Sequence, residues 1–137
     1  MPMASAGNGR VCVAVLRDAP PTQEEWSSWL TLLRARKGAP VRVLVETQSG
    51  PNASQRKALS DTLRDEDARF AILTDSLIVR GIVTALAWLG LPHHAFAPSQ
   101  HVQACNYLDL STEEREEAER ELSRLRRKLD EALGEQA

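Results

Sequence analysis

The stretch ARFAILTDSLIVRGIVTALAWLGL, residues 68–91, contains one complete strand–helix unit, and it guides the interpretation of the rest of the chain. Phe70 to Leu73 is a short, continuous apolar run of the kind that forms a buried strand. Thr74-Asp75 makes the turn that follows. A helix is expected from Ser76 to Leu89, because Gly90-Leu91-Pro92 would end it there. The stretch therefore predicts a strand that leads directly into an apolar helix.

The same unit recurs along the chain. Further strands are expected at 10–16, 41–45 and 94–97, and further helices are expected to begin at Thr22, Asn52 and Ser99. Four such units in series indicate an α/β fold with a four-stranded, mainly parallel sheet, flanking helices and right-handed crossovers. The α/β domain is assigned to residues 10–110, after a flexible N-terminus at residues 1–9.

The first helix has clear sequence boundaries. Thr22-Gln23-Glu24-Glu25 is a capping box that satisfies free amides at the helix start. Basic residues favour the negative C-terminal end of the helix, and Gly38 stops it. These basic residues are Arg34, Arg36 and Lys37.

The C-terminal segment, residues 111–137, has a different pattern. Ser111-Thr112-Glu113-Glu114 is another capping box, and a charged amphipathic helix is expected to follow to about Leu133. Its apolar positions recur at spacings of four and three, which is a heptad pattern. They are Ala118, Leu122, Leu125, Leu129 and Ala132. Acidic residues fill the first half of the helix and basic residues the second, an order that complements the helix dipole.

The composition is that of an ordinary soluble protein. The chain has 137 residues, of which 42% are hydrophobic and 26% charged, and this excludes collagen-like and wholly disordered chains. A net charge of −2 gives little electrostatic support for nucleic-acid binding. Cys12 and Cys105 form no CxxC pair, which indicates reduced thiols. Because no secretory signal or membrane span is evident, a cytoplasmic location is expected.

Catalytic motifs are missing from the sequence: there is no GxxxxGK[ST], GxGxxG, HExxH or GxSxG. His101 and Cys105 are four residues apart and could share a helix face as metal ligands. The interpretation we favour is a loop pair, His93-His94, and a helix-surface histidine, His101. A metal site would need further ligands, and the nearest candidates are only Cys105 and Asp109. We therefore expect no catalytic residue, no metal and no cofactor.

Polar residues follow two of the predicted strands at their carboxyl ends, where partners and ligands meet open α/β sheets. These candidate rim residues are Ser49, Ser54, Asp75 and Ser76. A phosphate on a serine at a helix N-terminus would meet free amides and a favourable dipole. The simpler interpretation, which we favour for any single residue, is that they are caps and turn residues.

The helix from Ser76 to Leu89 is apolar around most of its circumference, with breaks only at Arg80, Gly81 and Thr84. Such a helix is normally buried on more than one side. One face is expected to pack on the sheet, and the other needs a cover: the C-terminal helix, a second subunit or, less favoured, a lipid surface. The candidate interface residues are Ile78, Ile82 and Trp88 on this helix, and Leu122, Leu125 and Leu129 on the tail.

The order of elements over about residues 10–108 resembles the STAS domain, and most closely its SpoIIAA-like branch. The resemblance includes the local sequences RFAILTDSLIVRG (69–81) and HHAFAPSQHVQACNYL (93–108). It implies a binding module that docks partner proteins, often kinases, and is switched by Ser/Thr phosphorylation. The matching switch loop is Gln48 to Ser54, where Ser49-Gly50 only partly repeats the family's Asp-Ser-Ser-Gly. The family's N-terminal strand hairpin is expected here as a single strand, and the charged C-terminal helix is additional.

The sequence thus leads to three hypotheses of function, of which an enzyme of the doubly wound class is the weakest, because catalytic motifs are missing. The first is a non-enzymatic regulatory protein-interaction module that forms a homo-oligomer through its apolar helix and its tail, and that also binds protein partners of unknown identity. The second is a carrier of a small apolar ligand or lipid, in which the apolar helix lines a pocket. Fold analogy alone does not decide between them.

Overall fold

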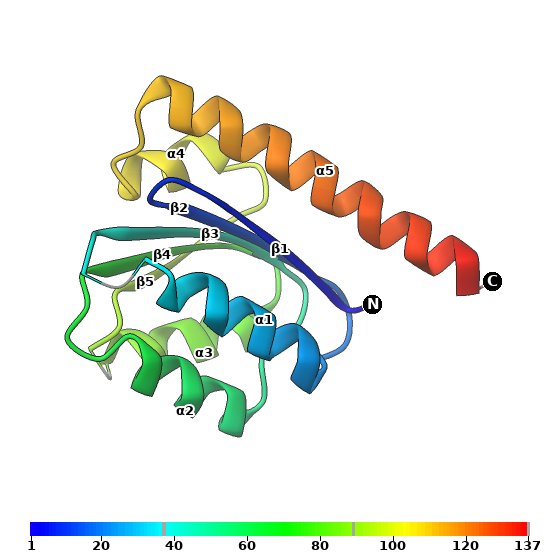
Figure 1. The fold of residues 1–137 in the computed structure, drawn as a ribbon, viewed down its shortest axis with the longest axis horizontal. Helices are drawn as coiled ribbons and strands as arrows, with labels where there is room; N and C mark the ends of the chain where they lie inside the picture. Colours follow the sequence, from blue (N-terminus) through cyan, green and yellow to red (C-terminus); the bar gives the residue numbers. More distant parts are fainter. Residues whose placement is uncertain (37, 89, 137) are drawn as a thin grey trace.

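The computed structural model describes residues 1–36, 38–88 and 90–136. The chain forms a central sheet with helices on both faces (Figure 1). The elements in chain order are β1 (Met3–Asn8), β2 (Val11–Leu16), α1 (Gln23–Arg34), β3 (Val41–Thr47), α2 (Ala53–Thr62), β4 (Ala68–Leu73), α3 (Leu77–Trp88), β5 (His93–Phe96), α4 (His101–Tyr107) and α5 (Thr112–Gln136). No helix within these described ranges is both long enough and apolar enough to cross a bilayer.

The sheet has five strands in the order β1-β2-β3-β4-β5. β1 is antiparallel to β2, and all the other neighbours are parallel. Each crossover from β2 to β5 steps to the next strand in the same direction. Right-handed crossovers of this kind place their helices on one face of the sheet, and α1, α2 and α3 do lie together there (Figure 1). Because the strand order never reverses among the parallel strands, the sheet lacks the switch-point crevice of doubly wound folds.

The prediction of an α/β fold with a mainly parallel sheet is confirmed, but the predicted count of four strands was wrong. Residues 1–9, which were expected to be flexible, contain β1 instead. β1 pairs with β2 through a two-residue loop in which Gly9 has a φ of 61°. The sequence of β1, MASAGN, contains no β-branched or aromatic residue, so its strand propensity is weak. Pairing with β2 and burial of Met3 and Ala4 stabilise it nevertheless.

The two faces of the sheet bury two separate apolar clusters. On β2, Cys12, Ala14 and Leu16 face α1–α3, and the alternating valines face the opposite side. This strand is therefore covered on both faces. The helix starts were also predicted correctly at Thr22 and Asn52, each of which caps its helix in a capping box. The predictions for Lys37 and Leu89 lie outside the described residues.

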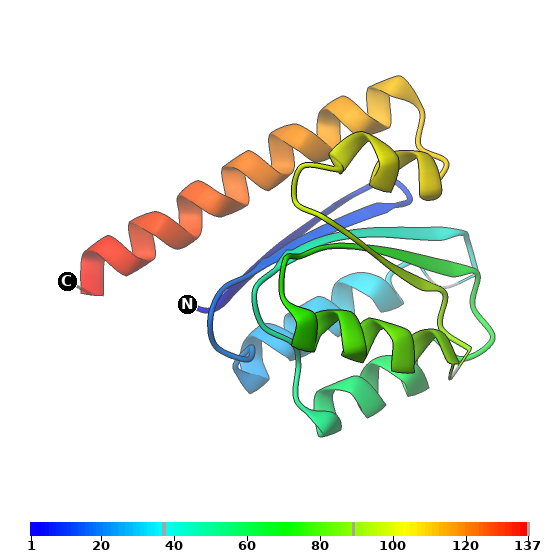
Figure 2. The same cartoon turned by 180° about the vertical axis from the view of Figure 1, so that it is seen from behind.

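The second face is covered by α4 and, mainly, by α5, which runs across β1 and β2 (Figure 2). The heptad leucines Leu122, Leu125 and Leu129 are all buried against this face. The proposal that these leucines form an interface with a second subunit was therefore wrong, because their own sheet already covers them. For the same reason the tail does not cover α3, which lies on the other side of the sheet.

Three ion pairs fix the position of α5 along the sheet. Glu114 accepts from Arg10 at 2.9 Å, Arg126 reaches Glu46 at 2.6 Å, and Arg17 reaches Asp130 at 3.0 Å. Partly exposed pairs of this kind contribute at most about 1 kcal/mol each. The buried leucines therefore supply most of the binding energy of α5, and the ion pairs select its register.

Leu125→Ala should reduce the free energy of unfolding by about 2–5 kcal/mol, because it leaves a cavity between α5 and the sheet. Leu133→Ala is the matched control, since Leu133 lies on the same helix but is 68% exposed; its effect should stay within about 0.5 kcal/mol. Urea denaturation of both variants measures the difference. Equal effects would contradict the packing of α5 described above.

Candidate functional site

The outer face of α3 presents large apolar side chains to solvent. Leu77 is 83% exposed, Ile78 is 79% exposed and Trp88 is 86% exposed. The opposite face of the same helix, with Val79, is buried in the core. The three side chains together expose roughly 500 Å² of apolar surface, which is within the range of the largest patches on monomers, and such patches are often functional.

Local contacts hold α3 in a fixed position. The Ser76 hydroxyl accepts from the backbone N–H of Val79, so Ser76 caps the helix. The Ser76 N–H in turn donates to the hydroxyl of the buried Thr74, and Arg80 donates to the Thr74 carbonyl. The orientation of the exposed face is thus determined by the end of β4.

Small residues occupy the middle of this face. Ile78, Gly81, Ala85 and Trp88 follow one another at spacings of three, four and three, so they form one stripe along the helix. We call them, together with Leu77, the α3 patch. A Cβ added at Gly81 would meet no atom within 4 Å. Glycine inside a helix is about 1 kcal/mol less favourable than alanine, so the packing of this chain supplies no reason for Gly81.

A groove of about 390 Å³ lies between α2 and α3, beside the patch. Its α3 side is apolar and consists of Ile82, Ala85 and Leu86. Its α2 side is mostly polar and carries three basic residues and one acid: Arg56, Lys57, Arg64 and Asp61. The sequence does not reveal this basic wall, because nothing in the spacing of α2 indicates which helix lies next to it.

Two of the predicted rim residues, Ser49 and Ser76, have local structural roles. The Ser49 hydroxyl donates to the backbone carbonyl of Arg17 at 2.5 Å and lies 3.0 Å from that of Ala19, which ties the β3–α2 loop to the β2–α1 loop. Ser54 and Asp75 are exposed. The rim adjoins α3, since a Cβ at Gly50 would lie 2.8 Å from Ile82 Cδ1.

A narrow apolar crevice lies behind α3, between the helices and the sheet. Its walls include Trp26, Trp29, Phe70 and His93, and its volume is about 60 Å³. Sites for drug-sized ligands have volumes of about 300–1,000 Å³. The crevice is therefore too small for a lipid chain or a typical cofactor.

His93 is a core histidine in this crevice. Its ring stacks on Phe70 with centroids 4.1 Å apart, and its Nδ1 lies 3.1 Å from the carbonyl oxygen of Leu91. Burial disfavours the charged imidazolium and lowers the pKa of His93 to about 4. The side chain is consequently neutral at physiological pH and acts in packing.

His101 and Cys105 meet on the opposite face of the sheet. Cys105 Sγ lies 3.6 Å from His101 Nε2, and Glu119 Oε1 lies 3.1 Å from the same nitrogen. Burial raises the pKa of Cys105 to about 11, so the sulfur is a thiol and a poor nucleophile. In a catalytic triad the carboxylate bonds to one ring nitrogen of the histidine and the nucleophile to the other. Here Glu119 and Cys105 lie at the same nitrogen of His101, so they do not form a triad. Within the described part of the chain, no group of three or more His, Cys, Asp or Glu side chains could hold a metal ion.

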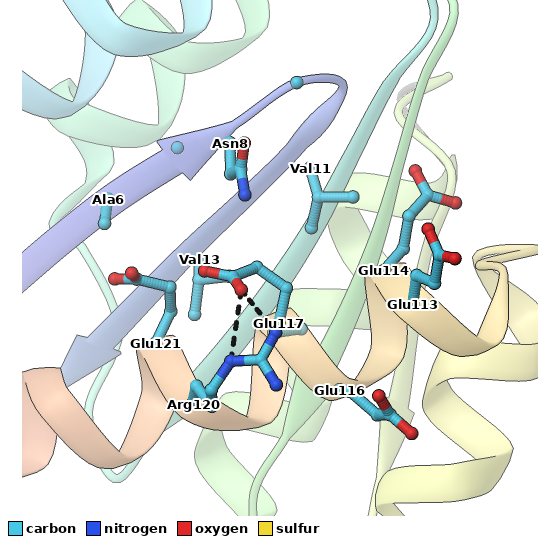
Figure 3. Close-up of a pocket in the computed structure, with 13 residues that line it drawn as sticks. Ala6, Asn8, Val11, Val13, Glu113, Glu114, Glu116, Glu117, Arg120 and Glu121 are labelled. Atoms are coloured by element: carbon cyan, nitrogen blue, oxygen red, sulfur yellow. Dashed lines mark hydrogen bonds and ion pairs between the residues drawn. The ribbon is translucent and has the colours of Figure 1, made fainter.

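A second hollow, of about 480 Å³, lies between the β1–β2 hairpin and α5. Figure 3 shows Glu117 and Glu121 extending from α5 toward the hairpin. Cations within the chain already pair with these acids: Arg120 lies 2.6 Å from Glu117, and Arg124 lies 2.8 Å from Glu121. Glu114 is also paired, and hydrogen bonds from Arg10 lower its pKa to about 2. The hollow therefore has less unpaired negative charge than the number of glutamates that line it suggests.

The fold should lose stability as the pH falls below 6.5. The pKa of His93 is about 4 in the folded protein, against an ordinary value of 6.5 that applies to the unfolded chain. Between these two pH values the unfolded chain therefore binds more protons than the folded protein. Stability is complete above pH 6.5 and should decrease by up to about 1.4 kcal/mol per pH unit as the pH falls toward 4.

Urea denaturation at several pH values tests this expectation with two variants. His93→Gln should flatten the dependence between pH 6.5 and 4.5, leaving a remainder from His101, whose pKa burial also lowers. His94→Gln is the matched control, because His94 is the adjacent and exposed histidine; it should keep the wild-type slope. A His93→Gln slope equal to that of wild type would disprove the assignment.

Comparison of the chain with protein-family models, with curated proteins and with solved structures found no match. The α3 patch, with the groove beside it, is the candidate site on the strength of its own geometry.

Proposed function

We propose that this protein is a non-enzymatic, regulatory protein-interaction module that docks its partners on the α3 patch. The observation that carries the proposal is the exposure of Leu77, Ile78 and Trp88 on a helix whose other face is fixed in the core. A rigid apolar surface can bind a partner without the entropic loss of ordering a flexible segment.

We also propose that the scaffold of this protein is similar to that of STAS domains. The resemblance implies an N-terminal strand hairpin, and β1 and β2 form such an antiparallel hairpin at the sheet edge. The order of strands and helices after it also follows the resemblance. These features support a STAS-like scaffold, and with it a role in binding proteins.

The alternative functions have weaker geometric support. A carrier of lipids or other apolar ligands would need a larger cavity than the crevice of about 60 Å³ behind α3. An enzyme would need an activated group in a cleft. The buried Cys105 is protonated, and the buried His93 bonds only to a backbone carbonyl.

We also propose a cytoplasmic location. Cys12 and Cys105 are free and buried, and they belong to the apolar clusters on opposite faces of the sheet. They cannot pair with each other in this fold, and free thiols suit a reducing compartment.

Ile78→Asp should abolish partner binding and leave the fold intact. Ile78 is exposed and lies in the first turn of α3, where the helix dipole favours a negative charge. The measurement is affinity capture from an extract of the native host, comparing wild type with the variant by quantitative mass spectrometry.

The matched control is Val102→Asp, which places the same charge on an exposed apolar residue in the first turn of α4, across the sheet. Partners bound by wild type and Val102→Asp should be lost from Ile78→Asp, with equal urea midpoints for all three proteins. Retention of the same partners by Ile78→Asp would refute docking on the α3 patch.

A further inference from the structure

We infer that the occupant of the α3 patch is an acidic amphipathic helix of another protein, lying in the groove between α2 and α3. This inference rests on the proposed function and specifies the chemistry of the partner. The shape of the surface and the charge of the α2 wall support it, and a second copy of this chain does not match them.

The shape of the surface fits a helix. Gly81 and Ala85 form a low middle section between the bulky side chains of Ile78 and Trp88, and the groove lies alongside it. The distance from Ile78 to Trp88 along α3 is about 15 Å, or nearly three helical turns. A partner helix with apolar residues spaced three and four apart could place them against Ile82 and Ala85. Without a side chain at Gly81, the two helices can approach closely.

The charge of the groove specifies the polar side of the partner. The α2 wall carries three cations, Arg56, Lys57 and Arg64, against one carboxylate, Asp61. Asp61 is shared between Lys57 and Arg64, with both contacts at 2.9 Å. Arg56 donates to a backbone carbonyl and not to an acid. The described residues of α3 include no Asp or Glu, so the surplus positive charge on this side favours a partner with acidic residues beside its apolar face.

A second copy of the chain does not supply this combination. The α3 patch of another copy brings no carboxylate. The acidic half of α5 brings carboxylates, but its leucines are buried against its own sheet. A dimer through α3 would therefore leave both basic walls unmatched. An anionic membrane would match the charge, but a concave groove fits a helix better than it fits a flat lipid surface.

The experiment uses a photo-crosslinking amino acid, p-benzoylphenylalanine, placed at Ala85, which is exposed and lines the groove. The full chain is expressed in its native host, irradiated and digested, and the crosslinked peptide is identified by mass spectrometry. We expect a segment of another protein with net negative charge and with apolar residues at three- and four-residue spacing. Placement at Trp88 should capture the same segment.

Two variants test the shape and the charge separately. Gly81→Leu should fill the low middle of the patch and reduce the crosslink yield at least about tenfold, while it maintains or raises the thermal midpoint because leucine is the better helix former. Lys57→Glu/Arg64→Glu should reduce the yield to a similar extent. Its matched control, Arg127→Glu/Lys128→Glu, makes the same charge change on exposed residues of α5 and should leave the yield unchanged.

Several results would overturn the inference: a crosslink to a second copy of this chain, a crosslink to a neutral or basic segment, or no protein crosslink from either position. Sedimentation of the purified protein with phosphatidylglycerol vesicles but not with phosphatidylcholine vesicles would also overturn it, in favour of a membrane. If Ile78→Asp loses its partners while the crosslinked segment is basic, the proposed function holds and only this inference fails.

Discussion

The arrangement of this molecule follows from one constraint, which is that both faces of a mainly parallel sheet must be covered. Successive crossovers in one direction place α1, α2 and α3 on the same face and leave the other face bare. α4 has seven residues, too few to cover that face alone. α5, with 25 residues, supplies the rest through its buried leucines. Because α5 is committed there, no element of the described chain remains to cover the outer face of α3.

The division of roles within α5 shows how apolar and charged residues act together. Leu122, Leu125 and Leu129 provide non-directional attraction to β1 and β2, which alone would allow the helix to slide. Arg10 pairs with Glu114 near the start of the helix, and Arg17 pairs with Asp130 near its end. Together these two ion pairs define one register of the helix on the sheet. Two residues of α5 that follow the charge order suited to the helix dipole, Glu114 and Arg126, thus also align the helix on the sheet.

The sequence was informative wherever the deciding contacts are local. Caps at Thr22 and Asn52 depend on residues three positions away, and the structure has them where they were predicted. The heptad spacing correctly identified which residues of α5 share a face. It did not reveal what that face contacts, because a spacing of four and three suits packing on a second helix and packing on a sheet equally well.

Errors arose where tertiary contacts override local preference. β1 is made of small residues and is stabilised by its pairing with β2, which no local pattern shows. The pattern of α3 correctly indicated an apolar circumference, but a pattern cannot distinguish an exposed Trp88 from a buried one. The basic wall of α2 became meaningful only beside α3, since a groove is a property of two elements.

The exposed patch also has a thermodynamic consequence for recognition. Val79 and Ser76 fix α3 before any partner arrives, so the loss of conformational entropy on binding falls mainly on the partner. Burial of apolar area supplies affinity, while the α2 cations act over longer distances and orient the approach. Removing apolar contacts should therefore chiefly increase the dissociation rate, and reversing the α2 charges should chiefly reduce the association rate. Salt screens the charges of α2 but not the apolar contacts of α3, so added salt should lower the association rate and leave the dissociation rate nearly unchanged. The ionic-strength dependence of the two rates therefore distinguishes the contribution of α3 from that of α2.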